Sequence, residues 1–387
     1  MKVAIAVKGR FHAFDLAREL HRHGALHRLL TTYPRRESRR FGIPDERVDT
    51  RIAQEIRRRA RSKLWRGLQS EAAILGDYLR FERSAERWLP DDADVFVGWS
   101  GSSLAALKRA KQLGIATVVE RGSTHVEWAR ETLIPVYEAA GLRPNVAPEA
   151  IARREVQEYE AADRIAIASK FVERTFVERG VPREKLLRVP YGVDVSAFDA
   201  APGPSPDGVF RVLFVGAVCL RKGVLPLLEA FGRLGGPKEL VLVGRVHPEL
   251  DAHLARVADD VRIVGSVPQH TLVDHYARAS VFCLPSYEEG FGMVVPQAMA
   301  AGRPVVASHP AADIVEDGRH GFVVAAGDVD ALTERLDVLR VDPDLGVALG
   351  AAAKDVVATS YSWEAYGARM LAGYRELLGA EAPSPAP

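Results

Sequence analysis

Short, uninterrupted apolar runs recur along the chain and alternate with stretches of helical periodicity. Most of these runs end at a turn signal, and a helical pattern follows. Runs of this kind are typical of parallel strands that are buried on both faces. They predict an α/β fold with two parallel, Rossmann-like sheets. The expected strands are residues 2–7, 95–98, 116–119 and 165–168 in the first half, and 212–215, 240–243, 261–264, 281–284, 305–307 and 322–324 in the second.

Residues 200–208 separate these two halves. The segment holds three prolines and two glycines in nine residues, which excludes a helix interior or a central strand. It predicts a linker between a first domain, residues 1–199, and a second domain, residues 209–361. Two open parallel sheets that face each other would form a cleft outside the carboxyl ends of their strands. The tail at 383–387 is expected to be disordered.

The composition is that of an ordinary globular protein with room for two cores. The chain has 387 residues, of which 47% are hydrophobic and 7% aromatic, and the low aromatic share argues against a nucleic-acid platform. Both cysteines, Cys219 and Cys283, sit in apolar runs and are expected to be buried thiols. No apolar run has the length of a membrane span, and the N-terminus does not resemble a signal peptide. We therefore expect a cytoplasmic protein, at most peripheral to the inner face of a membrane.

The net charge of +1 hides an asymmetry between the halves. Residues 1–190 carry 36 basic and 26 acidic side chains, whereas residues 191–387 carry 16 basic and 25 acidic ones. Residues 35–66 are the most basic segment, with 12 basic and 5 acidic side chains. This segment has two interpretations: a surface that rests on anionic lipid, or a solvated, arginine-rich helical face.

Residues 284–306 carry the most informative pattern, L-P-S-Y-E-E-G-F-G-M-V-V-P-Q-A-M-A-A-G-R-P-V-V. A predicted strand ends at residue 284, and a helix is expected from about 293 to 301. The loop between them presents Glu288 and Glu289 beside glycines, which let a ligand approach the backbone closely. Free amides at a helix start suit phosphate, while a carboxylate suits hydroxyl groups. A plain strand–turn–helix with surface carboxylates is the alternative interpretation.

This stretch resembles glycosyltransferase family 4, the retaining nucleotide-sugar transferases of GT-B architecture. The family pattern is E-G-F-G-x4-E-A-M-A-x-G-x-P-V-V, and its first Glu falls on Glu289. Its second Glu falls on Gln297. The resemblance assigns donor binding to Glu289, Gly290, Phe291, Gly292, Met293 and Gln297.

Other segments resemble the same family. In V-G-A-V-C-L-R-K-G, Lys222 falls on the Lys that holds the donor diphosphate, while Ala217 stands where many members carry an Arg. Arg221 is expected to supply that missing charge. The resemblance places Val267 beside the nucleotide base. The segment V-P-Y-G-V-D resembles the family's I-P-N-G-V-D, and a terminal helix at about 362–380 is expected to cross back to the first domain.

The first half matches less closely and is expected to bind the acceptor. Gly9 lies in the loop after the first strand, where the family has a glycine loop facing the donor, and His12, a candidate for acceptor binding, follows it. In E-R-G-S-T-H, the resemblance makes His125 the candidate for a residue near the transferred sugar, and Arg121 a candidate for acceptor or phosphate contact. Loop histidines without a ligand are the alternative for His12 and His125.

The implied reaction moves a sugar from a nucleoside-diphosphate sugar, UDP-sugar by default, to a lipid-linked or polysaccharide acceptor. The predicted catalytic residues are Lys222, Glu289 and His125. Lys222 would stabilise the leaving diphosphate, and Glu289 would orient the sugar. We expect no metal, no cofactor and no nucleic-acid partner. Two other functions remain open: a sugar-nucleotide epimerase of the same architecture, and a non-catalytic nucleotide-sugar or glycan-binding homologue.

Overall fold

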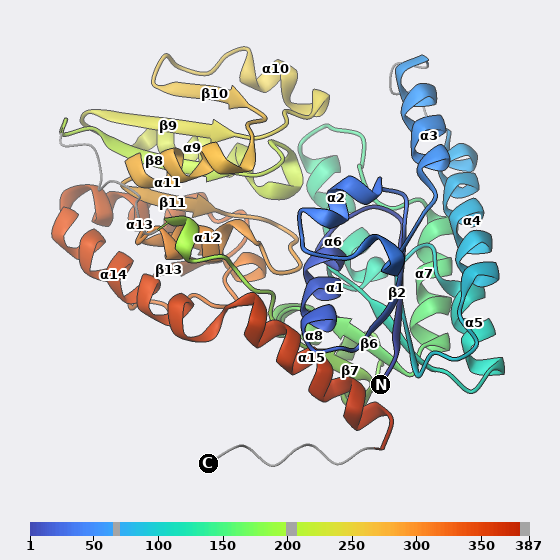
Figure 1. Ribbon diagram of the computed structural model, residues 1–387. Coiled ribbons are helices and arrows are strands. Elements are labelled where there is room, and N and C mark those ends of the chain that lie inside the picture. The colour runs from blue at the N-terminus through green and yellow to red at the C-terminus, as the bar shows by residue number, and fades with distance from the viewer. Residues whose placement is uncertain (65–69, 199–206, 380–387) are drawn as a thin grey trace.

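The computed structural model describes residues 1–64, 70–198 and 207–379, and it contains two parallel sheets (Figure 1). The first sheet has seven strands in the order β3-β2-β1-β4-β5-β6-β7. These are β1 Val3–Val7, β2 Leu26–Thr31, β3 Val48–Thr50, β4 Val95–Trp99, β5 Ala116–Glu120, β6 Arg164–Ile167 and β7 Leu186–Arg188. All neighbouring pairs are parallel, so the carboxyl ends of the strands share one edge.

The second sheet has six parallel strands in the order β10-β9-β8-β11-β12-β13. Its strands are β8 Phe210–Val215, β9 Lys238–Val243, β10 Val261–Gly265, β11 Val281–Leu284, β12 Val305–Ser308 and β13 Gly321–Val324. The two-sheet α/β architecture predicted from the apolar runs is therefore confirmed.

All ten predicted strands form, whereas β2, β3 and β7 were not predicted. In β2, His27 and Arg28 interrupt the apolar run, and β3 and β7 have three residues each at the two ends of the sheet. The polar residues of β2 and the short lengths of β3 and β7 leave no apolar run to recognise, whereas the edge strands β10 and β13 carry enough apolar residues to be predicted. The central strand β1, by contrast, is buried along its whole length.

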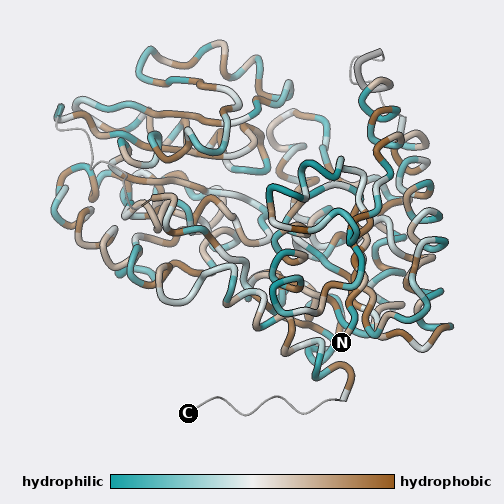
Figure 2. Tube along the Cα trace, viewed as in Figure 1, coloured by the Kyte–Doolittle hydropathy of each residue, from teal (hydrophilic) through white to brown (hydrophobic). Residues whose placement is uncertain are grey.

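Helices lie on both sides of each sheet (Figure 1). The helices of the first domain are α1 Ala13–Arg22, α2 Arg35–Arg39, α3 Ile52–Leu64, α4 Glu71–Trp88, α5 Leu104–Gln112, α6 Val126–Ala139, α7 Glu149–Ala161 and α8 Lys170–Val177. Those that follow are α9 Val224–Arg233, α10 Asp251–Leu254, α11 Leu272–Arg278, α12 Val294–Ala300, α13 Val329–Val341, α14 Pro343–Ser360 and α15 Trp363–Leu377. Figure 2 shows hydrophobic residues concentrated in the strands and on the helix faces turned toward them.

Helix α15 crosses from the second domain to the first and packs against α1, as the terminal helix was predicted to do (Figure 1). Gly367 permits this approach, because a methyl group there would lie 2.8 Å from Cγ of Glu19. Near its start, the Val193 amide donates a hydrogen bond to the Tyr361 carbonyl at 2.7 Å. The segments that connect the domains therefore lie side by side at 193 and 361.

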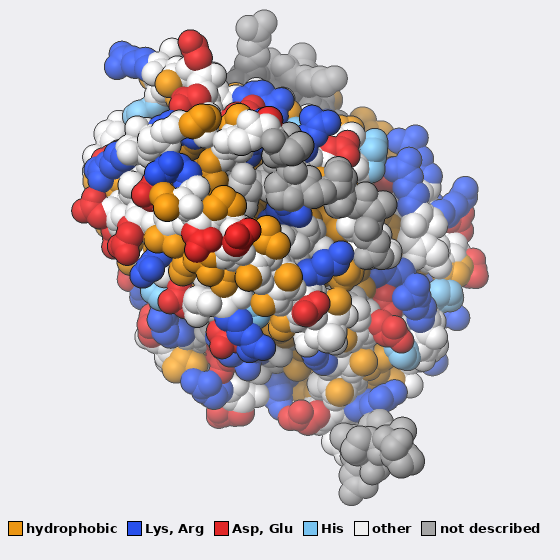
Figure 3. Space-filling model, turned by 90° about the vertical axis from the view of Figure 1, so that its left-hand side faces the viewer, with side chains coloured by type: hydrophobic (Ala, Val, Ile, Leu, Met, Phe, Trp, Pro, Cys, Tyr) orange, Lys and Arg blue, Asp and Glu red, His pale blue; other side chains and the backbone are white. Residues whose placement is uncertain are grey.

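The predicted linker at 200–208 lies almost wholly outside the described residues, as do the end of the predicted terminal helix at 380 and the tail at 383–387. Cys219 and Cys283 are buried free thiols, as predicted. Among the described helices, none is both long and apolar enough to span a membrane. On the face of the second domain in Figure 3, acidic, basic and hydrophobic side chains are interspersed.

Each sheet reverses its strand order at one point, and these points define where a site can form. The reversal falls between β1 and β4 in the first sheet and between β8 and β11 in the second. Loops leave the carboxyl ends of the two strands in opposite directions there, which opens a crevice. The loops after β8 and β11 carry Lys222 and Glu289, and the loop after β1 carries Gly9 and His12.

Candidate functional site

Two loops at the reversal point of the second sheet bring Lys222 and Glu289 together. Lys222 ends the 3-10 helix Leu220–Lys222 after β8, and Glu289 lies between β11 and α12. Their side chains form an ion pair between Nζ and Oε2, and each is only 12% exposed. The sequence predicted both as site residues, and the structure places them in one buried pair.

Two glycines with left-handed backbones shape these loops. Gly223 has φ 72°, and a methyl group there would overlap the carbonyl group of Pro285 in the neighbouring loop. Gly292 has φ 64°, a conformation that residues with a side chain rarely adopt. The first glycine lets the two loops touch, and the second turns the chain into α12, which together aligns Lys222 with Glu289.

Opposing effects of the surroundings act on the pKa of the Lys222 ammonium group. Burial and the neighbouring Arg221 guanidinium lower the pKa of Lys222 to about 7. The Glu289 carboxylate acts in the opposite direction, because it stabilises the ammonium form. The pair therefore presents a cation that an incoming anion can take over from Glu289.

Glu288 joins the two domains, a role that sequence reasoning missed. Its Oε1 accepts hydrogen bonds from the Ser123 hydroxyl, the Thr124 amide at 3.1 Å and the Thr124 hydroxyl at 2.7 Å. Burial opposes ionisation, but Arg221 and these donors lower the pKa of Glu288 to about 2. The carboxylate therefore stays charged and fixes the loop after β5 against the second domain.

Arg221 is engaged by the same carboxylate. Its Nη1 donates to Oε2 of Glu288 at 2.9 Å and to the Glu288 carbonyl at 3.0 Å. The side chain remains 30% exposed and lines the space between the domains. Its position beside Lys222 is the predicted one, but in this arrangement Glu288 takes up part of its charge.

A polar cavity of about 270 Å³ lies at this junction. Its walls come from both domains: the loop after β5, helix α6, residues 145–147, Arg221 and the two adjacent carboxylates of the second domain. Three predicted site residues line it, namely Arg121, Arg221 and Glu289. Glu288, Arg130 and Asn145 line it as well and were not among the predicted residues.

Arg121 holds the loop that forms one wall. Its Nε donates to the Thr124 carbonyl at 2.9 Å, and its Nη1 donates to Oε2 of Glu155 at 2.6 Å. Although burial disfavours the cation, the Glu155 carboxylate raises the pKa of Arg121. Arg121 is therefore a permanent charge that shapes the loop and reaches the cavity wall.

His12 lies in a polar and aromatic cluster at the edge of the first sheet. Its Nε2 is 3.2 Å from Oε2 of the buried Glu120, and its ring centroid is 4.1 Å from that of Tyr191 and 5.1 Å from that of Trp99. A methyl group on Gly122 would lie 4.0 Å from the His12 ring. The structure thus places His12 next to the loop that faces the second domain.

The prediction that His125 is a site residue needs correction, because the structure does not bring this residue to the cavity. The residue caps α6, and its Nδ1 accepts a hydrogen bond from the Glu127 amide at 3.3 Å. Its ring lies against Tyr159 and Phe176 in the interior of the first domain. Burial and Arg121 lower its pKa to about 4. The loop turns into the helix at Thr124, so the histidine points inward.

The remaining predicted residues do not line the cavity. Gly9 has φ 132°, and its carbonyl accepts a hydrogen bond from the Thr31 hydroxyl at 2.6 Å. The Gly290 amide lies 3.2 Å from Oε1 of Glu289, Phe291 is buried, and Met293 precedes α12. Val267 is half-buried against the core of the second domain. Their donor contacts remain predictions.

Gln297 lies on α12, and its orientation is fixed. The buried Tyr276 hydroxyl donates to its Oε1 at 3.0 Å and to the Val294 carbonyl at 3.2 Å. The side-chain NH2 group of Gln297 is then left as a donor. A Glu at this position would keep the bond from Tyr276 and present a second carboxylate oxygen instead.

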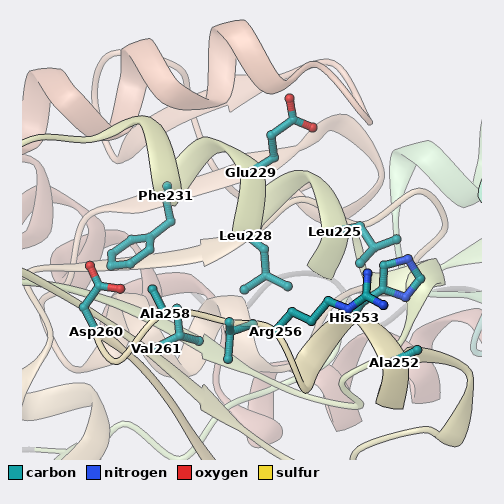
Figure 4. A pocket seen from close by; sticks show the side chains of 12 residues that line it. Leu225, Leu228, Glu229, Phe231, Ala252, His253, Arg256, Ala258, Asp260 and Val261 are labelled. Carbon is teal, nitrogen blue, oxygen red and sulfur yellow. The ribbon is translucent and has the colours of Figure 1, made fainter.

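A second cavity, of about 540 Å³, lies elsewhere in the second domain (Figure 4). Leu225, Leu228 and Phe231 of α9 face Ala258 and Val261 across it, with His253 and Arg256 at one end. It is largely apolar and contains none of the predicted site residues. The short helix α10, with four residues, leaves this face of α9 partly uncovered.

Two Rossmann-like domains with a site at their junction define the GT-B class of proteins. Sucrose-phosphate synthase from Thermosynechococcus elongatus has this fold: it superposes with a TM-score of 0.69 at 20% identity, covering 98% of this chain and 100% of that one. Residues 10–197 match the family described as Glycosyltransferase Family 4, and residues 209–342 match Glycosyl transferases group 1. The chain therefore belongs to glycosyltransferase family 4.

Two curated relatives illustrate the family. The D-inositol 3-phosphate glycosyltransferase of Kribbella flavida is 33% identical, over 62% of this chain and 64% of that enzyme. The GDP-mannose-dependent alpha-(1-6)-phosphatidylinositol monomannoside mannosyltransferase of Mycolicibacterium smegmatis is 32% identical, over 56% of this chain and 63% of that enzyme. The chain thus spans less than two thirds of the length of these relatives.

Proposed function

We propose that the protein is a retaining glycosyltransferase that moves a hexose from a nucleoside-diphosphate sugar to a hydroxyl group of a lipid-linked or polysaccharide acceptor. The observation that carries this proposal is the buried Lys222–Glu289 pair at the reversal point of the second sheet, beside the junction of the domains. A cation and an adjacent carboxylate match the two ends of the bond that breaks, namely the diphosphate and the sugar.

The pair suggests how charge moves during the reaction. When the donor enters, the Lys222 ammonium passes from Glu289 to the diphosphate and stabilises the charge that grows on it as the bond to the sugar breaks. Glu289 then accepts hydrogen bonds from sugar hydroxyls and orients the sugar. The acceptor hydroxyl attacks from the face that the diphosphate leaves, and its proton passes to a leaving phosphate oxygen, so the configuration is retained.

We propose GDP-mannose as the first donor to test. UDP-sugar is the default from family frequency, but a relative supports GDP-mannose, since the mannosyltransferase of Mycolicibacterium smegmatis is described as GDP-mannose-dependent. That enzyme is 32% identical to this chain. Its phosphatidylinositol-based acceptor also agrees with the proposal of a lipid-linked acceptor here.

The basic segment at 35–66 is relevant to a lipid-linked acceptor, because its charge could attract an anionic membrane. Arg36, Arg39 and Arg40 are exposed, but Arg39 pairs with Asp45 and Arg40 pairs with Glu37. On α3, Arg58 and Arg59 both pair with Glu55. These pairs neutralise part of the charge, so attraction to an anionic membrane would depend on the remaining arginines. The side chains of residues 61–66 lie outside the described residues.

A donor screen tests the proposal. Thermal unfolding and hydrolysis are measured with GDP-mannose and with UDP- and ADP-sugars. Because a bound ligand stabilises by mass action, the true donor should raise the melting temperature most and should be hydrolysed to the nucleoside diphosphate. A rise in melting temperature with a UDP-sugar alone would identify the UDP-sugar, not GDP-mannose, as the donor. No response to any sugar nucleotide would contradict the function.

Mass spectrometry of the products separates the two alternatives. A transferase releases nucleoside diphosphate and adds a hexose to the acceptor. An epimerase returns a sugar nucleotide of unchanged mass and releases no nucleoside diphosphate, and a non-catalytic homologue binds the nucleotide sugar without turnover. Either result would replace the proposed reaction.

We expect the affinity for GDP to fall as the pH rises above about 7. The pKa of Lys222 is lowered to about 7, so the ammonium is present below that pH and lost above it. Losing an attractive charge weakens diphosphate binding by up to about tenfold per pH unit. Calorimetric titration between about pH 6 and pH 9 measures this. Lys222→Arg keeps its charge, so its GDP affinity should not change with pH. If the GDP affinity of this variant fell with pH as steeply as that of the wild type, another group would be responsible.

Replacing Gln297 by Glu should tighten donor binding. In the family, the Glu at this position commonly binds the ribose hydroxyls, and a carboxylate forms stronger, charge-assisted hydrogen bonds. With Tyr276 already satisfying one oxygen, we expect a dissociation constant about 3- to 10-fold lower. Gln112→Glu adds the same charge at an exposed position at the end of α5 and serves as the control. An unchanged dissociation constant in Gln297→Glu would remove Gln297 from the ribose site.

A further inference from the structure

The hydroxyl group of Tyr191 is buried and makes no hydrogen bond to any described residue. The side chain is 5% exposed, and the oxygen is one of few such atoms in the described part of the chain. Tyr191 stands where the family pattern I-P-N-G-V-D has an Asn. An unpaired buried hydroxyl is unfavourable, so its presence calls for an explanation.

The hydroxyl lies at the junction of the domains. A methyl group on Gly122 would lie 3.3 Å from the Tyr191 oxygen. The Tyr191 ring stacks on His12 from one side, with 4.1 Å between centroids, and meets the edge of Phe291 at 5.5 Å. Gly122 and His12 belong to the first domain, whereas Phe291 belongs to the second.

Contact between two loops is what covers this position. A methyl group on Gly290 would overlap the Gly122 carbonyl and would lie 3.1 Å from Cα of Ser123. The loop after β5 and the loop after β11 thus touch beside Tyr191. Separating them by the thickness of a ligand would uncover the hydroxyl next to Phe291, two residues from Glu289.

Tyr276 is a buried tyrosine of the same chain whose hydroxyl group does have hydrogen-bond partners. It is fully buried, but its hydroxyl donates to the Val294 carbonyl and to Gln297. Burial raises the pKa of Tyr191 well above its usual range, so its hydroxyl stays protonated and is available as a donor. Tyr191 therefore has an unused donor at a junction that must open to admit substrate.

We propose that the Tyr191 hydroxyl binds a hydroxyl group of the transferred sugar once the donor separates the two loops. This inference rests on the proposed function and adds a sugar-recognising residue on the first-domain side of the junction. Glu289 would hold the sugar from the second domain, and Tyr191 would hold it from the first. The sugar hydroxyl would then be the hydrogen-bond partner of the Tyr191 hydroxyl.

The test is Tyr191→Phe, which removes only the oxygen and keeps the ring packing. GDP and GDP-mannose, or the corresponding pair that the donor screen identifies, are titrated into both proteins. We expect the affinity for the nucleotide sugar to fall about 3- to 10-fold, the size of one hydrogen bond, while the affinity for the nucleoside diphosphate stays within about twofold. An equal affinity of wild type and variant for the nucleotide sugar would overturn the inference.

Tyr374→Phe is the matched control, because the Tyr374 hydroxyl in α15 is also buried and without a described partner. It should leave both affinities unchanged, and a loss equal to that of Tyr191→Phe would also overturn the inference. Monodeoxy analogues of the sugar nucleotide add a second measurement. The wild type should discriminate against one analogue, and Tyr191→Phe should lose that discrimination. If wild-type protein binds no nucleotide sugar at all, the proposed function fails first, which is a distinct result.

Discussion

Lys222→Ala should lower the rate of sugar transfer by about 100-fold or more. The substitution removes the ammonium that the structure holds against Glu289 at the junction. Removing one group that stabilises charge in a transition state typically costs this much in rate. Single-turnover measurements of nucleoside diphosphate release, at saturating donor, report the loss directly.

Lys238→Ala provides the control for this experiment. Lys238 is similarly buried, at 11% exposed, and its Nζ donates to the carbonyls of Phe231 and Leu234 at the end of α9. We expect this variant to lose stability but to keep its rate per folded molecule. Near-normal turnover in Lys222→Ala would show that Lys222 does not act on the leaving group.

Gly290→Ala should lower turnover by about 100-fold while leaving nucleotide binding nearly intact. The backbone at Gly290 is not left-handed, so alanine fits its conformation. The added methyl group, however, would point at the Gly122 carbonyl, into the space between the two loops that the sugar is proposed to enter, and would displace the sugar. A displacement of about 1 Å between reacting groups can cost about 100-fold in rate. Because Lys222 lies wholly in the second domain, GDP affinity measured by titration should change little.

Gly235→Ala is the matched control, because a methyl group there meets no atom within 4 Å. It should leave turnover unchanged. If Gly290→Ala turned over at the normal rate, the space between Gly122 and Gly290 would not belong to the sugar site.

Much of the fold followed from local sequence. The central strands are buried on both faces, so their apolar runs are continuous and were all predicted. The edge strands β3 and β7, and β2 with its His27 and Arg28, carry no such run and were missed. The edge strand β10 has no buried residue and was nevertheless predicted, so the sequence records a run of apolar residues rather than burial itself.

The candidate site was likewise predicted only in part from the sequence. Lys222 and Glu289 lie in glycine-containing loops with a recognisable pattern, and the structure places them in contact. The family resemblance made His125 a candidate for a residue near the transferred sugar, but the sequence does not state where the loop ends and α6 begins. A shift of one or two residues at a helix start decides whether a side chain faces the cleft or the core. His12, a predicted acceptor-binding residue, lies beside the loop at the junction.

By itself, the sequence determined two parallel-sheet domains, a strand–loop–helix with paired carboxylates, and a lysine in the matching loop, because each of these is encoded within a few consecutive residues. Only the tertiary structure decided that Glu288 ties the domains together and that Tyr191 keeps a buried, unused hydroxyl between them. Both depend on atoms about 70 to 165 residues apart in the chain, and such pairings arise from packing of the domains rather than from any local pattern.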